Sequence, residues 1–127
     1  MSTNGGNQNK LLYGELSYSI NGVLFETHNE LGQFAREKQY SDSVEKKFIE
    51  KKIPYKRELL VGDSGNIFDF LVDDSVVVEL KCKPFLLNSD YDQVKRYLQS
   101  SDLELGILVN FRSKYLQPKR IIRKRPN

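Results

Sequence analysis

The chain has few of the residues that form covalent cross-links and metal clusters, because its 127 residues include one cysteine and one histidine. A lone Cys82 excludes an internal disulfide and a cysteine-rich metal cluster, as expected of a protein in a reducing cytoplasm. No apolar run is long enough to span a bilayer. The polar start, MSTNGGNQNK, lacks the apolar segment of a signal peptide. These absences predict a cytoplasmic protein without a membrane segment.

Acidic residues are missing from residues 112–127, which hold seven Lys or Arg, whereas the other residues hold 13 basic and 17 acidic ones. A basic end on an acidic body is suited to a polyanion such as nucleic acid. A solvated basic tail is an equally open alternative. The length fits one domain, so we expect a disordered leader over residues 1–10 and a single domain over 11–127.

Helical and strand-like apolar patterns follow one another along the chain. They predict helices over residues 16–31, 35–52 and 88–100, and strands over residues 55–61, 67–72, 76–82, 105–111 and 119–124. Ser89 and Asp92 have the spacing of a capping box at the start of the third helix. The order of helix, helix, three strands, helix and strand predicts an α/β domain with a central sheet covered by helices.

The stretch between the second and third predicted strands specifies a hairpin register. If residues 73–75 form a three-residue loop, Val72 pairs with Val76, and Asp69 then lies opposite Glu79 on one face of the sheet. Directly opposed side chains have Cβ atoms about 5 Å apart, so two carboxylates there repel each other. A divalent cation would offset the repulsion, and carboxylate oxygens suit Mg²⁺ or Mn²⁺.

Lys81 shares a strand face with Glu79, because successive strand side chains alternate between faces. Its ammonium group could polarise a water molecule or stabilise negative charge on a phosphate. Two alternatives stay open: a simple Glu79–Lys81 ion pair on an exposed face, and a register slipped by one residue that separates the acids.

Other polar side chains fall near the expected site. Glu37 has the spacing of the apolar stripe of the second helix, which would turn it toward the sheet, unless it lies at the margin and counters Lys38 or Lys47. On the third helix, Gln93 and Tyr97 share a face, suited to a phosphate or ligand. A tyrosine ring packed in the core is the alternative reading of Tyr97.

Two further residues are expected to be structural. His28 lies near an apolar helix face, where a hydrogen-bonded structural histidine is commoner than a ligand or a base. Cys82 falls on the strand face opposite Glu79 and is interpreted as a small core residue.

Asp69 followed by Glu79-Leu80-Lys81 resembles the D…(D/E)xK signature of the PD-(D/E)xK nuclease superfamily. The element order is similar to that fold's core, a restriction-endonuclease-like mixed sheet flanked by helices (ααβββαβ). Over about residues 16–123 the chain more closely resembles the small bacterial GxxExxY family, through residues 28–32, 36–40, 68–72, 78–81 and 108–111. Phe34 stands at that family's glycine and Phe68 at the proline of the signature, and neither departure removes a ligand.

The resemblance implies roles for particular residues. Asp69 and Glu79 would bind the metal, Lys81 would assist the attacking water, and Glu37 would be an extra metal or water ligand. Gln93 and Tyr97 are similar to the QxxxY motif of the recombination-associated branch of these nucleases, which is implied to contact DNA and support the site.

These observations lead to the hypothesis of a Mg²⁺- or Mn²⁺-dependent nuclease that hydrolyses phosphodiesters, with DNA favoured over RNA. Basic side chains would track the strand backbone, and the candidates are Arg112, Lys114, Lys119 and Arg120. The small size suggests that a homodimer or a partner protein is needed to grip a duplex. One alternative is a catalytically inactive nucleic-acid-binding or adaptor module on the same fold. Another is a structural or regulatory partner.

Overall fold

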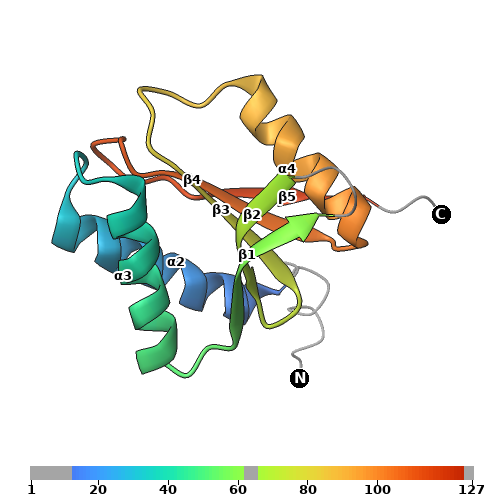
Figure 1. Ribbon diagram of the computed structural model, residues 1–127, viewed down its shortest axis with the longest axis horizontal. Helices are drawn as coiled ribbons and strands as arrows, with labels where there is room; N and C mark the ends of the chain where they lie inside the picture. Colours follow the sequence, from blue (N-terminus) through green and yellow to red (C-terminus); the bar gives the residue numbers. More distant parts are fainter. Residues whose placement is uncertain (1–12, 62–65, 125–127) are drawn as a thin grey trace, which may run out of the picture.

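The computed structural model describes residues 13–61 and 66–124, so the predicted leader over residues 1–10 lies outside the described part. A five-stranded sheet lies between two helical layers (Figure 1). Helices α2 (Gly14–Leu31) and α3 (Glu37–Glu50) cover one face, and α4 (Asn88–Ser101) covers the other. Within these described residues, no helix combines the length and apolarity that crossing a bilayer requires.

The sheet is mixed and its strands follow chain order. They are β1 (Tyr55–Val61), β2 (Asn66–Val72), β3 (Val76–Lys81), β4 (Leu105–Asn110) and β5 (Lys119–Ile122). The β3–β4 pair is parallel and the other three pairs are antiparallel. This arrangement confirms the predicted fold class. The last strand is shorter than predicted and ends at Ile122.

The central strands are apolar along their whole length because both faces of the sheet are covered. Every residue of β4 is buried, as are the first five residues of β3. On one side Tyr40, Val44 and Phe48 of α3 pack on the sheet together with residues of α2. Their spacing of four places them on one helix face. On the other side α4 contributes Val94 and Tyr97 to a second core.

Helix α4 starts where expected, but the predicted capping box is wrong. Ser89 and Asp92 are exposed, and it is Asp90 whose carboxylate accepts the Leu87 backbone N–H at 2.7 Å. A carboxylate in the first turn satisfies an N–H that the helix leaves without an internal partner. Asp90 is buried because it also faces the loop that leads from β3 to α4.

The β1–β2 hairpin crosses from one face of the sheet to the other. Arg57 pairs with Phe70 on the α3 side, whereas Leu59 and Phe68, paired two residues further on, pack on the α4 side. Residues two apart in a regular strand share a face. The switch falls at Glu58, whose φ is 58°, in the left-handed region that non-glycine residues seldom occupy. The pairing of β2 with β3 ends next to this switch, at Phe70 and Val78.

Candidate active site

Strands β2 and β3 separate at the predicted acidic pair. The register Val72–Val76 that the loop length predicted is confirmed, but the ladder stops at Phe70–Val78, one pair before Asp69 and Glu79. Beyond that pair, the two strands are joined by hydrogen bonds between side chains and the backbone. The Asp69 N–H donates to Glu79 Oε1 at 3.1 Å, and the Leu80 N–H donates to Asp69 Oδ2 at 2.7 Å. Each carboxylate therefore has one oxygen fixed by the backbone of the opposite strand.

Glu79 is buried, with 4% of its surface exposed. Burial raises the pKa of Glu79 to about 9, the negative charge of Asp69 adds to the rise, and Lys81 partly opposes it. A buried carboxylate beside a second one is unfavourable when both are ionised. The arrangement is therefore suited to a cation or a proton between the two side chains.

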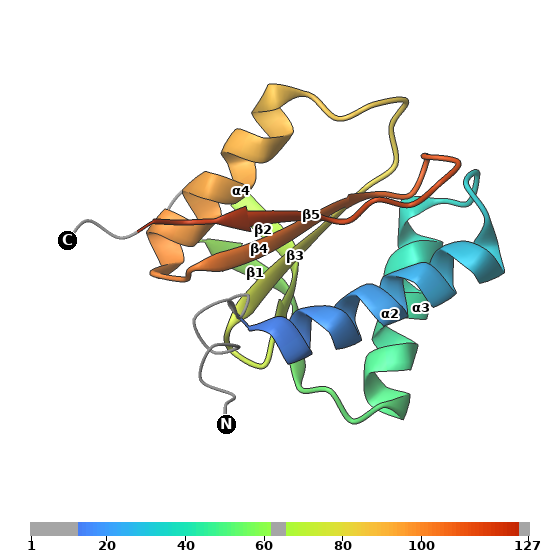
Figure 2. The same cartoon turned by 180° about the vertical axis from the view of Figure 1, so that it is seen from behind.

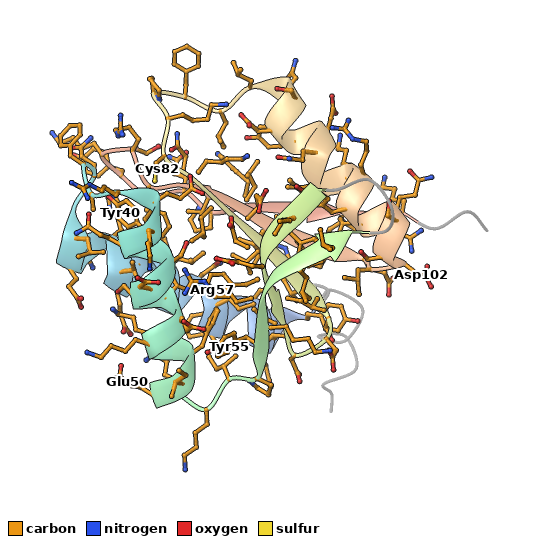
Figure 3. The ribbon with its side chains drawn as sticks, in the orientation of Figure 1. Tyr40, Glu50, Tyr55, Arg57, Cys82 and Asp102 are labelled. Carbon is orange, nitrogen blue, oxygen red and sulfur yellow. The ribbon has the colours of Figure 1, made fainter. Side chains whose placement is uncertain are left out.

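Asp69 reaches solvent through a polar groove of about 530 Å³ between α3 and β1. Besides Asp69 of β2, the groove is lined by side chains of α3 and β1: Glu37, Lys38, Ser41, Glu45, Arg57 and Glu58. Arg57 is fixed in its wall because its guanidinium lies 2.8 Å from Glu45 and 5.7 Å from the centre of the Phe70 ring. Figure 3 shows Tyr55 and Arg57 between β1 and α3. The groove gives a ligand access to Asp69.

Glu37 is the first residue of α3, and its side chain is exposed rather than buried on the apolar stripe of the helix. It lines the same groove as Asp69. Partial burial raises the pKa of Glu37, Asp69 adds to the rise, and Lys81 lowers it. Within residues 13–61 and 66–124, no three acidic, histidine or cysteine side chains form a group that could hold a metal ion. Of the three predicted metal ligands, Asp69 and Glu79 are thus the two that hydrogen bonds hold next to each other.

Lys81 points its ammonium group into a polar cluster under α4. Its Nζ donates to Gln93 Oε1 at 3.1 Å and lies 3.9 Å from Glu79 Oε2. A third oxygen, Asp90 Oδ1, is 3.8 Å away. The alternative of a simple exposed Glu79–Lys81 pair does not hold, because Glu79 is buried and Lys81 is only partly exposed. The lysine is held at the acidic pair by groups from a different element.

Asp90 is a site residue that the sequence reasoning missed. Its carboxylate accepts from Lys83 Nζ at 2.9 Å as well as from the Leu87 backbone. Burial opposes its ionisation, but the hydrogen bond from Leu87 and the charges of Lys83 and Lys81 outweigh that effect and hold the pKa of Asp90 below its ordinary value. Asp90 is the third residue of α4, the position at which an acid caps a helix start. The predicted capping box places Asp92 in that role instead.

Asn110 is the second missed residue and fixes the loop after β3. Its amide nitrogen donates to the Lys83 carbonyl at 2.8 Å, and its Oδ1 accepts the Lys83 N–H at 3.1 Å. The same Oδ1 accepts the Arg112 N–H at 3.2 Å. Asn110 pairs with Lys81 across the parallel β3–β4 ladder. A buried asparagine at the end of an apolar strand was the available signal.

Gln93 and Tyr97 both reach the site from α4, in different ways. Gln93 holds Lys81, whereas Tyr97 is 1% exposed and packs its ring against Phe68 in the core. The Tyr97 hydroxyl donates to the Ile67 carbonyl at 3.2 Å. Burial and the nearby Glu79 and Asp69 raise the pKa of Tyr97 to about 12. Tyr97 therefore supports the separated β2 strand from within the core.

The four predicted phosphate-binding residues divide into two groups. Arg112 and Lys114 lie in the β4–β5 loop, where Arg112 Nε donates to the Gln33 carbonyl at 3.1 Å. Lys119 and Arg120 lie on β5, where Arg120 donates to Ser17 of α2 at 2.6 Å. Two of the four side chains, Arg112 and Arg120, therefore also bond to groups of the protein itself.

His28 and Cys82, the two residues expected to be structural, both pack within the fold. His28 is buried and its Nε2 lies 2.8 Å from the Ser113 carbonyl, so it ties α2 to the β4–β5 loop. Cys82 packs partly buried against the core on the α3 side, and burial raises the pKa of its thiol to about 11. Neither side chain belongs to the acidic pair.

Comparison with known proteins adds one finding. The model of the PD-(D/E)XK nuclease superfamily matches residues 14–124, which is nearly the whole described chain. No curated protein and no solved structure matches the sequence.

Proposed function

The chain belongs to the PD-(D/E)XK nuclease superfamily, and on that premise we propose that it hydrolyses phosphodiester bonds with the help of a divalent cation. We favour DNA over RNA as the substrate. The observation that carries the proposal is the buried Asp69–Glu79 pair at the point where two strands separate, with Lys81 beside it. These are the residue types that metal-assisted hydrolysis requires.

The donor set at the pair fits Mg²⁺ or Mn²⁺. Asp69 and Glu79 offer hard carboxylate oxygens, and a cation would offset the burial and the repulsion from Asp69 that together raise the pKa of Glu79. Mg²⁺ is commonly held by one or two carboxylates together with substrate phosphate and water, so a compact pair is sufficient. Glu37, at the groove beside Asp69, is the further acidic ligand in this proposal.

The chain's own residues orient the reacting groups. When bound, the cation would lower the pKa of a water molecule and neutralise charge on a phosphate. Backbone N–H groups hold one oxygen of Asp69 and one of Glu79, which fixes the direction of the other two. Lys81 stabilises negative charge that develops on the phosphate, and Gln93 keeps its ammonium group at that point.

A second candidate is a catalytically inactive nucleic-acid-binding or adaptor module on the same fold. Its support is that the acidic pair has no third ligand close enough for a metal-binding group within the described residues. The buried Glu79 argues against it, because replacement by a neutral residue would relieve an unfavourable burial. An inactive module would have no use for that charge.

Finer assignments follow from the same proposal. We place the chain in the GxxExxY family through residues 28–32, 36–40, 68–72, 78–81 and 108–111. We treat residues 11–127 as one cytoplasmic domain. Arg112, Lys114, Lys119 and Arg120 contact the phosphate backbone. A homodimer or a partner protein assists in gripping a duplex.

Cleavage of labelled single-stranded and duplex oligonucleotides tests the proposal. The wild type should cleave in Mg²⁺ or Mn²⁺ and not in EDTA, and Asp69→Asn, Glu79→Gln and Lys81→Ala should each lose at least about 100-fold in rate. Glu50→Gln, which changes an exposed acid at the far end of α3, is the matched control and should cleave normally. Normal cleavage by Glu79→Gln would refute the proposed site, and binding in Mg²⁺ without cleavage would favour the inactive module.

A further inference from the structure

Three loops lie at, or start from, the end of the sheet where β3 and β4 finish, and each exposes a large aromatic ring. They are residues 32–36, 82–87 and 111–118. Phe34 is 78% exposed, Phe85 69% and Tyr115 74%. Figure 2 shows the α2–α3 turn beside the β4–β5 loop, as Figure 1 also does from the other side. We call Phe34, Phe85, Tyr115, Arg112 and Lys114 the loop surface.

The loop surface is built on a fixed frame. Gln33 Nε2 donates to the Arg112 carbonyl at 3.0 Å, and Arg112 Nε donates back to the Gln33 carbonyl at 3.1 Å. Asn110 holds Lys83 through both backbone groups. These bonds hold the backbone from which the exposed rings project, so the loops lose little additional freedom when a ligand binds.

Cations lie over two of the exposed rings. The Arg112 guanidinium is 5.7 Å from the centre of the Phe34 ring, and the Lys114 ammonium is 5.5 Å from that of Tyr115. Together the three loops contain four Lys or Arg and no acid. A surface that combines aromatic faces with positive charge is complementary to a strand whose bases stack while its phosphates are neutralised. An apolar protein segment would not require these cations.

Two of the loops that carry the loop surface start beside Lys81. Lys81 and Asn110 are paired at the end of the ladder, and the Phe111 N–H donates to the Lys81 carbonyl at 2.9 Å. Two of the three loops begin directly after these strand ends. A strand lying on the loop surface would thus pass close to Lys81.

We propose that the loop surface stacks unpaired bases, so that the substrate is single-stranded nucleic acid or a single-stranded end of a duplex. This inference rests on the proposed nuclease function for its catalytic meaning. Bases within a duplex are stacked on each other and do not offer their faces to protein rings, whereas unpaired bases do.

The test is equilibrium binding in EDTA, where no hydrolysis occurs, to an unstructured labelled oligothymidylate of about 20 nucleotides, enough to cover a site of the usual size. The double variant Phe34→Ala/Tyr115→Ala should raise the Kd for the single strand at least about 10-fold, which is at the modest end of the effect of losing stacked bases. Its Kd for a duplex of the same length should change by less than about twofold.

Tyr18→Ala is the matched control, because Tyr18 is 82% exposed near the other end of α2. It should leave both Kd values unchanged. Equal weakening toward duplex and single strand, or no weakening at all, would overturn the inference. An unchanged Kd would also make a protein the better candidate for the occupant of the loop surface.

Failure of this inference is distinguishable from failure of the proposed function. If the wild type binds the single strand through the loop surface but does not hydrolyse it in Mg²⁺ or Mn²⁺, hydrolysis is refuted and the binding surface stands. If hydrolysis occurs while the double variant binds the strand as the wild type does, the loop surface is refuted and the nuclease stands.

Discussion

Replacing Glu79 by Gln should stabilise the metal-free protein, and the gain should grow with pH. The pKa of Glu79 rises from 4.5 to about 9 on folding, because burial and Asp69 disfavour its charge. Between about pH 4.5 and pH 9, Glu79 is therefore protonated in the folded protein and ionised in the unfolded chain. Within that window the free energy of unfolding of the wild type falls as the pH rises.

The size of the effect follows from the shift. Each pKa unit corresponds to about 1.4 kcal/mol, so at about pH 8 the cost of Glu79 approaches about 5 kcal/mol as an upper limit. The glutamine amide keeps an oxygen that can accept the Asp69 N–H and carries no charge to bury. We expect a gain of about 2–4 kcal/mol at about pH 8 and less than about 1 kcal/mol at about pH 5.

Urea unfolding in EDTA at a series of pH values measures this difference. The wild type and Glu79→Gln are compared with Glu50→Gln, an exposed acid whose replacement should shift stability by less than about 0.5 kcal/mol at every pH. Parallel pH profiles for the wild type and Glu79→Gln would refute the reasoning. A less stable Glu79→Gln at high pH would do so as well.

Two further changes address other parts of the structure. Asp90→Asn keeps an acceptor for the helix start but removes the charge that holds Lys83 and lies near Lys81, so cleavage should fall about 10-fold while the melting temperature drops by only a few degrees. Recovery of cleavage in Asp90→Glu would separate a role of this charge from a structural one, and unchanged kinetics in Asp90→Asn would contradict the role. Gly106→Ala should destabilise the protein by about 1–3 kcal/mol in thermal unfolding, because an added Cβ would lie 2.6 Å from Val94 Cγ1. Val94→Ala in the same chain should recover part of that loss, and a neutral Gly106→Ala would contradict the packing of α4 on β4.

The sequence contained enough to predict the elements and the hairpin register. The three-residue length of the loop at residues 73–75 specifies which residues pair, and Val72 indeed pairs with Val76. The continuous apolar runs of β3 and β4 likewise follow from their central position. Both features depend on residues that are close together in the sequence, so they can be predicted without knowing the rest of the fold.

The separation of β2 from β3 at Asp69 could not be predicted in the same way. It coincides with the left-handed conformation at Glu58 and with the packing of Phe68 against Tyr97, a contact between residues 29 positions apart that no local pattern specifies. The exposed position of Glu37 also depends on where α3 starts relative to the sheet. Asp90 was missed because the helix is capped through the backbone of Leu87, a residue type without a capping side chain.

The central claim is that Asp69 and Glu79 form a divalent-cation site where two strands separate. A titration of Mn²⁺ into the metal-free protein, followed by thermal unfolding, tests it most directly, because a ligand that binds only the native state raises the melting temperature. We predict a rise for the wild type and for Glu50→Gln, and none for Asp69→Asn. An equal rise in Asp69→Asn, or no rise in the wild type, would contradict the assignment of the cation to this pair.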